Sequence, residues 1–188
     1  MLERITEKIY PISRTSLQAL ESLIEVEIFE KRATFVRAGK PNDKEYFVLD
    51  GVCRSYLLNP KGEEITISFY TADSVLAPHL TRTRAGISRL NYQALAPLKV
   101  ASIAAAAFDQ LRIDNAEIRN FAQVVLQNEL YRKVEKEIGL ASLTAKDRLL
   151  EFRAAFPMLE NIVPHPDIAS YLGITNISLS RLRKELKK

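Results

Sequence analysis

The stretch HPDIASYLGITNISLSRLRKEL, residues 165–186, decides how the C-terminal part of this chain folds. On either side of Gly173 its apolar residues recur with the period that gives a helix one apolar face. They are Ile168, Ala169 and Leu172 before the glycine and Leu179, Leu182 and Leu186 after it. Gly173 can adopt the positive φ that ends a helix, and the Thr175 side chain can cap the next one. The stretch therefore predicts two short helices joined by a tight turn.

Positive charge is concentrated at the end of this stretch. Residues 181–188 carry five basic side chains and one acidic one, a net charge equal to the +4 of the whole chain. Two helices joined across a glycine turn form a helix-turn-helix, whose second helix enters the major groove of DNA. A basic end on an otherwise neutral chain also suits a polyanion. The alternative is an amphipathic C-terminal helix whose charged face is simply solvated.

Composition limits the remaining classes of protein. The 188 residues are 47% apolar, which is enough for one large or two small domains with a packed core. A single cysteine, Cys53, excludes a disulfide framework and a four-thiolate cluster within one chain, and we expect it to pack in the core. No stretch approaches the length of a membrane span, and the N-terminus has no apolar signal segment. We therefore expect a cytoplasmic protein.

The first hundred residues change from a helical to an alternating pattern. Residues 1 to about 26 predict a helix, and the period is two from Phe29 to Ile103. Asn59-Pro60-Lys61-Gly62 predicts a hairpin turn. The predicted strands are 34–37, 46–49, 52–58, 65–70 and 91–95. Short strands at even spacing indicate a sandwich or a small barrel.

A long helix is predicted from about residue 104 to residue 138, with apolar residues four apart. Its apolar surface is wider than one small barrel can cover, so we expect a second copy of the chain to cover part of it. The alternative is a helix buried entirely within one chain. Gly139 is expected to interrupt this helix as a hinge, and Thr144 to cap the next one. The expected dimer contacts are Ile118, Phe121, Val125, Leu126, Asn128, Leu130 and Val134.

Taken in this order, the elements resemble the bacterial Crp/Fnr family of regulators. Residues 39–51 look like the family's glycine-bounded strand pair, and Ser180-Arg181 matches a serine–arginine pair of its recognition helix. The resemblance implies an α+β fold, with an N-terminal jelly-roll, cyclic-nucleotide-binding-like β-barrel domain (1–108). A dimerisation helix (109–138) and a helix-turn-helix domain (139–188) follow. Because the sequence stops at Lys188, we expect the usual β-hairpin wing to be reduced or absent.

This resemblance implies a homodimeric transcription regulator that binds a near-palindromic operator in double-stranded DNA and contacts RNA polymerase. Arg181 is then expected to bind a guanine or a phosphate, and Asn176 to read an adenine. The residues expected to bind DNA are Thr175, Asn176, Ile177, Ser178, Ser180, Arg181, Arg183 and Lys184. No P-loop, nucleophile elbow or other catalytic constellation is present, so we expect no enzyme, no metal ion and no other cofactor. A cupin-like metalloenzyme needs clustered histidines, which one barrel histidine cannot supply.

The expected effector site departs from the family pattern. Cyclic-nucleotide binders of the family hold the phosphate with a Gly-Glu-Leu turn and an Arg-Ser pair, and Ala77, Pro78 and Ser88 stand at those positions here. We therefore expect an unknown small-molecule effector other than cyclic AMP. A true cyclic-nucleotide sensor and a module that signals through protein contacts are the alternatives. The expected pocket residues are Leu76, Ala77, His79, Arg84, Ser88, Arg89 and Lys133.

Overall fold

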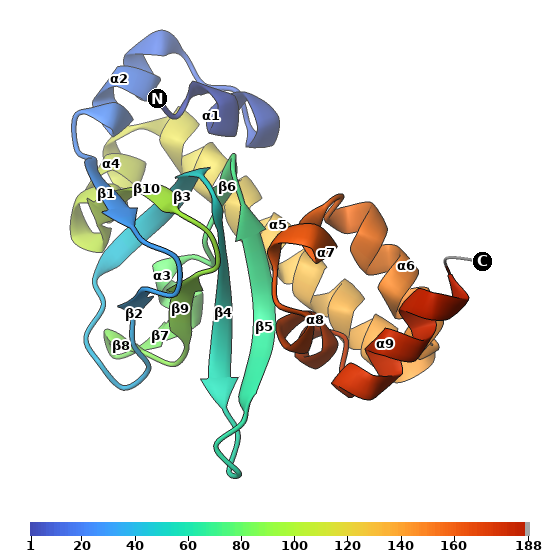
Figure 1. Cartoon of the computed structure of the whole chain (residues 1–188). Helices are drawn as coiled ribbons and strands as arrows, with labels where there is room; N and C mark the ends of the chain where they lie inside the picture. The colour runs from blue at the N-terminus through green and yellow to red at the C-terminus, as the bar shows by residue number, and fades with distance from the viewer. Residues whose placement is uncertain (187–188) are drawn as a thin grey trace.

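The structure is a computed structural model that describes residues 1–186, and Lys187 and Lys188 of the basic end lie outside it. Two four-stranded antiparallel sheets form the jelly-roll barrel, in the strand orders β1-β10-β3-β6 and β2-β9-β4-β5 (Figure 1). Between them lies a core built from both sheets, with Val48, Tyr70 and Tyr92 almost fully buried. The strands are β1 (Glu25–Phe29), β2 (Thr34–Val36), β3 (Lys44–Asp50), β4 (Val52–Leu58), β5 (Glu64–Thr71), β6 (Ser74–Val75), β7 (Thr83–Arg84), β8 (Ile87–Ser88), β9 (Asn91–Ala94) and β10 (Leu98–Ala104).

Local sequence explains the two tight turns of the central strands. The Asn59 side-chain oxygen accepts hydrogen bonds from the amides of Lys61 and Glu63, both at 2.9 Å, which closes the β4–β5 hairpin at the predicted place. Gly51 joins β3 to β4 with φ +89°, and a Cβ there would overlap the Pro97 carbonyl oxygen. Only glycine can occupy that position without moving the backbone.

The N-terminal segment differs from the predicted single helix. It forms α1 (Glu3–Ile9) and α2 (Arg14–Glu21), and β1 already begins at Glu25. The break is local, because Pro11 follows α1 and the Ser13 hydroxyl caps α2 by accepting a hydrogen bond from the Ser16 amide at 3.3 Å.

The long helix is also divided, but not at the predicted place. α4 (Ala105–Asp114) ends at Asn115, whose side chain caps α5 (Ala116–Ser142) by accepting from the amides of Glu117 and Ile118. α5 then continues through Gly139, so the predicted interruption there is wrong. Gly139 is buried in the helix, and its cost relative to alanine, about 1 kcal/mol, is small beside the packing of a long helix.

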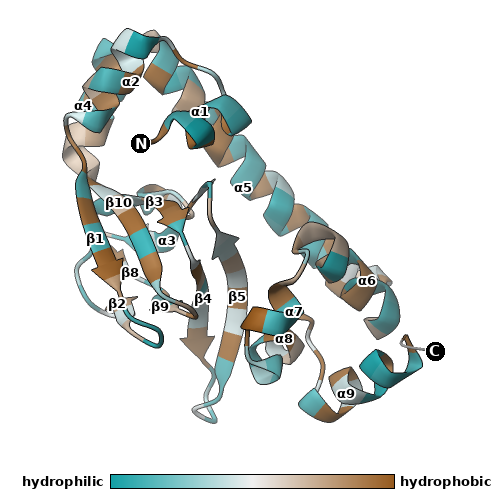
Figure 2. Cartoon of the chain, turned by 45° about the horizontal axis from the view of Figure 1, so that its top comes forward, coloured by the Kyte–Doolittle hydropathy of each residue, from teal (hydrophilic) through white to brown (hydrophobic). Residues whose placement is uncertain are grey.

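Four helices follow α5 within residues 1–186, and two of them, α6 and α8, contact strand β5 of the barrel. α6 (Ala145–Ala155) is capped by Thr144 as predicted, and α7 (Leu159–Ile162) leads to α8 (His165–Tyr171) and α9 (Asn176–Glu185). Ile168 of α8 and Phe152 of α6 share one apolar cluster with Phe69 of β5. α5 passes alongside both the barrel and this helical region (Figures 1 and 2). The short helix α3 (His79–Arg82) lies between β6 and β7.

Candidate functional site

Helices α8 and α9 form the predicted helix-turn-helix. Gly173 has φ +67°, and the Thr175 hydroxyl caps α9 by accepting from the Ser178 amide at 3.1 Å. Leu179 is buried against α8, with Leu182 and Leu186 packed beside it. The opposite face of α9 is exposed, and it carries Asn176, Ile177, Ser180, Arg181 and Lys184. Ile177 is 67% exposed, which is unusual for an isoleucine and leaves its methyl groups open to a partner.

Three of the residues expected to bind DNA, Thr175, Ser178 and Arg183, are engaged within the chain. The Ser178 hydroxyl lies 2.9 Å from the Thr175 hydroxyl. The Arg183 guanidinium lies between α7 and α8, where Nε is 3.1 Å from Glu160 Oε1 and Nη1 is 2.6 Å from His165 Nε2. Arg183 therefore holds the helix-turn-helix together, and Arg181 is the arginine on its open face.

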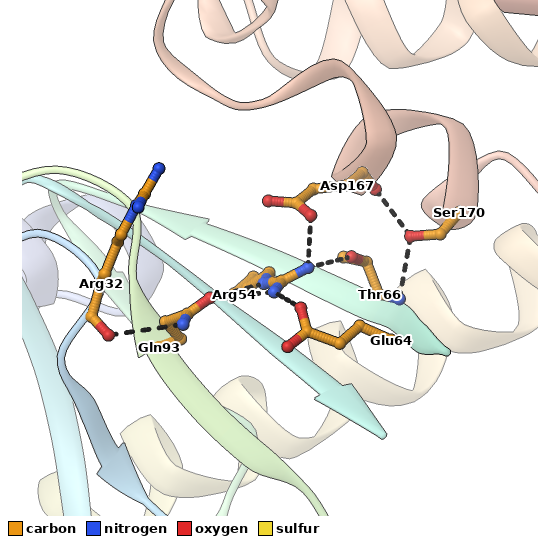
Figure 3. A network of polar contacts seen from close by, with 7 residues as sticks. All are labelled: Arg32, Arg54, Glu64, Thr66, Gln93, Asp167 and Ser170. Carbon is orange, nitrogen blue, oxygen red and sulfur yellow. Dashed lines mark hydrogen bonds and ion pairs between the residues drawn. The ribbon is translucent and has the colours of Figure 1, made fainter. Parts of the chain in front are cut away.

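A polar network joins α8 to the barrel (Figure 3). Arg54 of β4 is only 2% exposed, and its Nη1 donates to Asp167 Oδ1 at 2.6 Å and to Thr66 Oγ1 at 3.2 Å. The same guanidinium also donates to Gln93 Oε1 and pairs with Glu64. Beside it, the Thr66 amide donates to the Ser170 hydroxyl at 3.1 Å. The first helix of the helix-turn-helix is thus fixed to strands β4 and β5.

An aromatic cluster extends this contact to α5 and α6. The ring centroid of Phe69 on β5 lies 5.2 Å from that of Tyr171 and 5.9 Å from that of Phe152. Lys136 of α5 sits over the Tyr171 ring, with Nζ 3.9 Å from its centroid, and donates to the Ile67 carbonyl at 2.7 Å. The pKa of Lys136 is lowered to about 7, mainly by burial and also by the nearby positive charge of Lys133.

The surface of α5 is divided between the chain's own core and solvent. Ile118, Phe121 and Val125 are almost fully buried within the chain, in one cluster with residues of α1, α2 and β3. They cover the outer face of the sheet that contains β3 and leave little surface for a second copy, so their place in a dimer interface stays a prediction. Further along the helix, four apolar residues form an exposed stripe, which we call the α5 stripe. It comprises Leu126, Leu130, Val134 and Ile138.

The residues of the expected effector site do not meet around one cavity. Leu76, Ala77 and Ser88 are buried, whereas Arg84 and Arg89 are exposed. His79 is held in place, because its Nε2 donates to the Asn42 carbonyl at 2.8 Å and its amide donates to Glu45. Lys133 lies on α5, where its Nζ donates to Ser68 Oγ at 2.7 Å.

The barrel interior is occupied by a side chain that the sequence did not single out. Arg82 of α3 is 2% exposed, with Nε donating to the Ala77 carbonyl at 3.0 Å. Its guanidinium lies 5.2 Å from the Tyr46 ring centroid and 5.9 Å from that of Tyr92. Cys53 is fully buried in the same core, where burial raises the pKa of its thiol, as expected for a packing residue.

Comparisons with known proteins agree on this architecture, although no family model matches the chain. The global nitrogen regulator of Nostoc sp. is 26% identical over 179 residues, which cover 87% of this chain and 78% of that protein. FixK2 from Bradyrhizobium japonicum superposes with a TM-score of 0.75 at 21% identity, covering 87% of this chain and 84% of that one. A Crp/Fnr-family transcriptional regulator from Eubacterium rectale superposes with a TM-score of 0.72 at 14% identity, covering 94% and 84%.

The chain is similar in sequence and in fold to Crp/Fnr-type transcription regulators. The predicted fold, a jelly-roll barrel with a long helix and a C-terminal helical region, is confirmed. The curated relatives it matches are named as regulators. None of the chain's described helices is long and apolar enough to cross a membrane. Within residues 1–186, no group of three or more His, Cys, Asp or Glu side chains could hold a metal ion.

Proposed function

We propose that the chain is a Crp/Fnr-type transcription regulator, which acts in the cytoplasm as a homodimer and binds a near-palindromic operator in double-stranded DNA through α9. The open face of α9 carries the proposal. Arg181 and Lys184 lie on it, and neither makes an ion pair with any described residue. Two such helices, one from each protomer, would enter major grooves one DNA turn apart.

Each residue of this face has a chemistry that suits DNA. The Arg181 guanidinium can pair bidentately with guanine or clamp a phosphate, and the Asn176 amide can read adenine. Ile177 can contact a thymine methyl, while Lys184 and Ser180 suit phosphates. Thr175, Ser178 and Arg183 act through the rest of the motif, because each has a partner within the chain.

The α5 stripe supports the homodimer. Leu130 is 64% exposed and Ile138 is 51% exposed, and apolar side chains four residues apart along a helix suit a second helix of the same kind. Asn128 is exposed nearby and can fix the register of the pair of helices.

We place the barrel domain at residues 1–108, the dimer helix from 109 and the joint to the helix-turn-helix at residues 143–144, where α5 ends.

Regulation would act on the orientation of the two α9 helices. Because α8 is fixed to β4 and β5, a change in the barrel would move α9 with it. An effector of still unknown identity, or contact with RNA polymerase, matters only if it favours one orientation over another. The effector would not be cyclic AMP, because Arg82 and three tyrosines fill the barrel interior.

The test of DNA recognition compares two arginines of α9. Arg181→Ala should weaken binding to an operator selected from random DNA by about 1–3 kcal/mol, because it removes a base or phosphate contact. Arg183→Ala removes the same charge from the inward side of the helix and should leave sequence discrimination unchanged. Fluorescence anisotropy at several salt concentrations measures both. Unchanged affinity for Arg181→Ala, or equal losses for the two variants, would contradict the assigned roles.

The test of the homodimer places a charge on the α5 stripe. Leu130→Glu should shift the chain to monomers, because a carboxylate cannot be buried unpaired between two apolar helices. Leu150→Glu is the matched control, since Leu150 is a similarly exposed leucine of α6, outside the stripe. Sedimentation velocity reports the mass of each variant. Dimers that persist in Leu130→Glu would place the interface elsewhere.

A further inference from the structure

A cavity of about 390 Å³ lies outside the barrel interior, where α4 and the first half of α5 cover the sheet that contains β3 (Figure 1). Cavities of this size hold small organic ligands in other proteins. Its wall is mostly apolar, formed by aromatic and aliphatic side chains of both the sheet and the helices, with Arg112, Arg119 and Gln123 among the other lining residues. The apolar lining residues include Phe47, Val75, Phe108, Phe121, Val125 and Leu126.

One buried carboxyl group interrupts this apolar wall. Glu45 of β3 lines the cavity and is 8% exposed. Its two oxygens share a single donor, the His79 amide, at 2.9 and 2.8 Å. Among residues 1–186, no cationic group lies within ion-pair distance of it. A carboxylate has about four acceptor sites, so most of the hydrogen-bonding capacity of Glu45 is unused.

Several charged groups near Glu45 affect the ionisation of its carboxyl group. The pKa of Glu45 is raised to about 7, mainly by burial and also by Asp109, although the His79 amide, Arg82 and Arg112 act in the opposite direction. Arg112 is already paired with Asp109 at 3.4 Å, and Arg119 is exposed at the mouth. Among the residues that line the cavity, the carboxyl group of Glu45 therefore lies at the buried end and the guanidinium groups of Arg112 and Arg119 lie towards solvent, whereas Arg82 is buried in the barrel and does not line the cavity.

We propose that this cavity is a binding site for a small amphipathic amine, with its apolar body against the phenylalanines and its protonated nitrogen on Glu45. The ammonium group supplies the counter-charge that the buried carboxylate lacks. A ligand with a carboxylate at the same end would meet a like charge in a desolvated place. Leu126 both lines the cavity and begins the α5 stripe, so the bound amine would lie beside the proposed dimer contact.

The test uses three probes with the same alkyl chain: n-octylamine, n-octanol and octanoate. Isothermal titration calorimetry with the full chain should rank the amine tightest and octanoate weakest. Glu45→Gln keeps an acceptor for the His79 amide but removes the charge, and it should weaken amine binding about tenfold while leaving octanol unaffected. Glu137→Gln, an exposed position on α5, is the matched control and should bind like the wild type.

Proton linkage gives an independent readout at the same site. Because the pKa of Glu45 is raised to about 7, the carboxyl group is largely neutral at about pH 6 and largely ionised at about pH 8. Amine binding should therefore tighten across this range, and octanol binding should not. The pH dependence should disappear in Glu45→Gln.

Three results would overturn the proposal. Octanoate binding most tightly would assign the site to Arg112 and Arg119, and undiminished amine binding by Glu45→Gln would remove Glu45 from it. Amine binding by monomeric Leu130→Glu but not by the wild type would show that a second copy fills the cavity. DNA binding, measured on the same samples without any amine, tests the proposed function separately.

Discussion

Helices α8 and α9 are neighbours across Gly173, yet their outer surfaces face different surroundings. Asp167 and Tyr171 of α8 contact the barrel and α5. Arg181 and Ile177 of α9 are exposed to solvent. The outer surface of α8 is thus covered by other parts of the chain, whereas that of α9 is free to contact a partner. The orientation in which α9 is presented is set by the contacts of α8.

The polar part of the α8 contact positions the helix more than it stabilises it. Burial raises the pKa of Asp167, and the favourable charge of Arg54 does not fully offset this. The ionised Asp167 is therefore less favourable in the folded protein than in water. A buried ion pair of this kind is a weak source of stability, although removing only one partner is costly.

Breaking the α8 contact at Arg54 should have the largest effect on stability. Arg54→Ala leaves Asp167 and Glu64 facing each other without their shared cation, and removes the donor to Gln93. The loss of one partner of a buried charge network costs about 3–5 kcal/mol. Urea unfolding followed by circular dichroism measures it. We expect a lower midpoint, with α9 no longer held in one orientation.

Asp167→Asn is the matched test on the other side of the pair. An amide can still accept from Arg54, and the buried charge is removed, so the free energy of unfolding should change by less than about 1 kcal/mol. If Asp167→Asn were as destabilising as Arg54→Ala, the ion pair itself would be the main source of stability at this contact. The polar contact would then stabilise the fold and not only position α8.

The sequence predicted those features of the fold that depend on local patterns, such as the ends of helices and strands. Gly173 and Thr175 mark the end of α8 and the start of α9, because a positive φ and a side-chain cap are local requirements. The strand 52–58 was placed correctly, because turn residues bound it on both sides. Residues 1–26 were misassigned, because Leu23 and Ile24 extend a helical period that Pro11 and Ser13 had already broken.

Tertiary contacts could not be predicted in this way. Arg82, Arg84 and Arg89 look alike in sequence, yet only Arg82 is buried in the barrel. Arg54 and Asp167 are 113 residues apart, and no local pattern connects them. The apolar period of α5 gave no sign that Phe121 would face the barrel while Leu130 faces solvent. A period identifies an apolar face but not which partner covers it.

The pH dependence of folding stability should show a smaller difference between the surroundings of α8 and those of α9. Lys136, below α8, has a pKa of about 7, whereas its ordinary value is 10.5. Between these values the unfolded chain binds the proton that the folded chain has lost, so folding stability rises with pH. From about pH 7 to about pH 9 the gain should be about 2 kcal/mol. Urea unfolding at both pH values should show this gain in the wild type but not in Lys136→Met.

Lys184→Met is the control, because it removes a lysine from the exposed face of α9 and not from the contact between α8 and α5. Lys184 is exposed on α9, so its removal should leave the rise with pH intact. Loss of the rise in both variants would mean that it reflects the net charge of the chain. If only Lys136→Met loses the rise in stability with pH, the rise comes from the desolvated ammonium group of Lys136. That group contacts the Tyr171 ring of α8 and the Ile67 carbonyl.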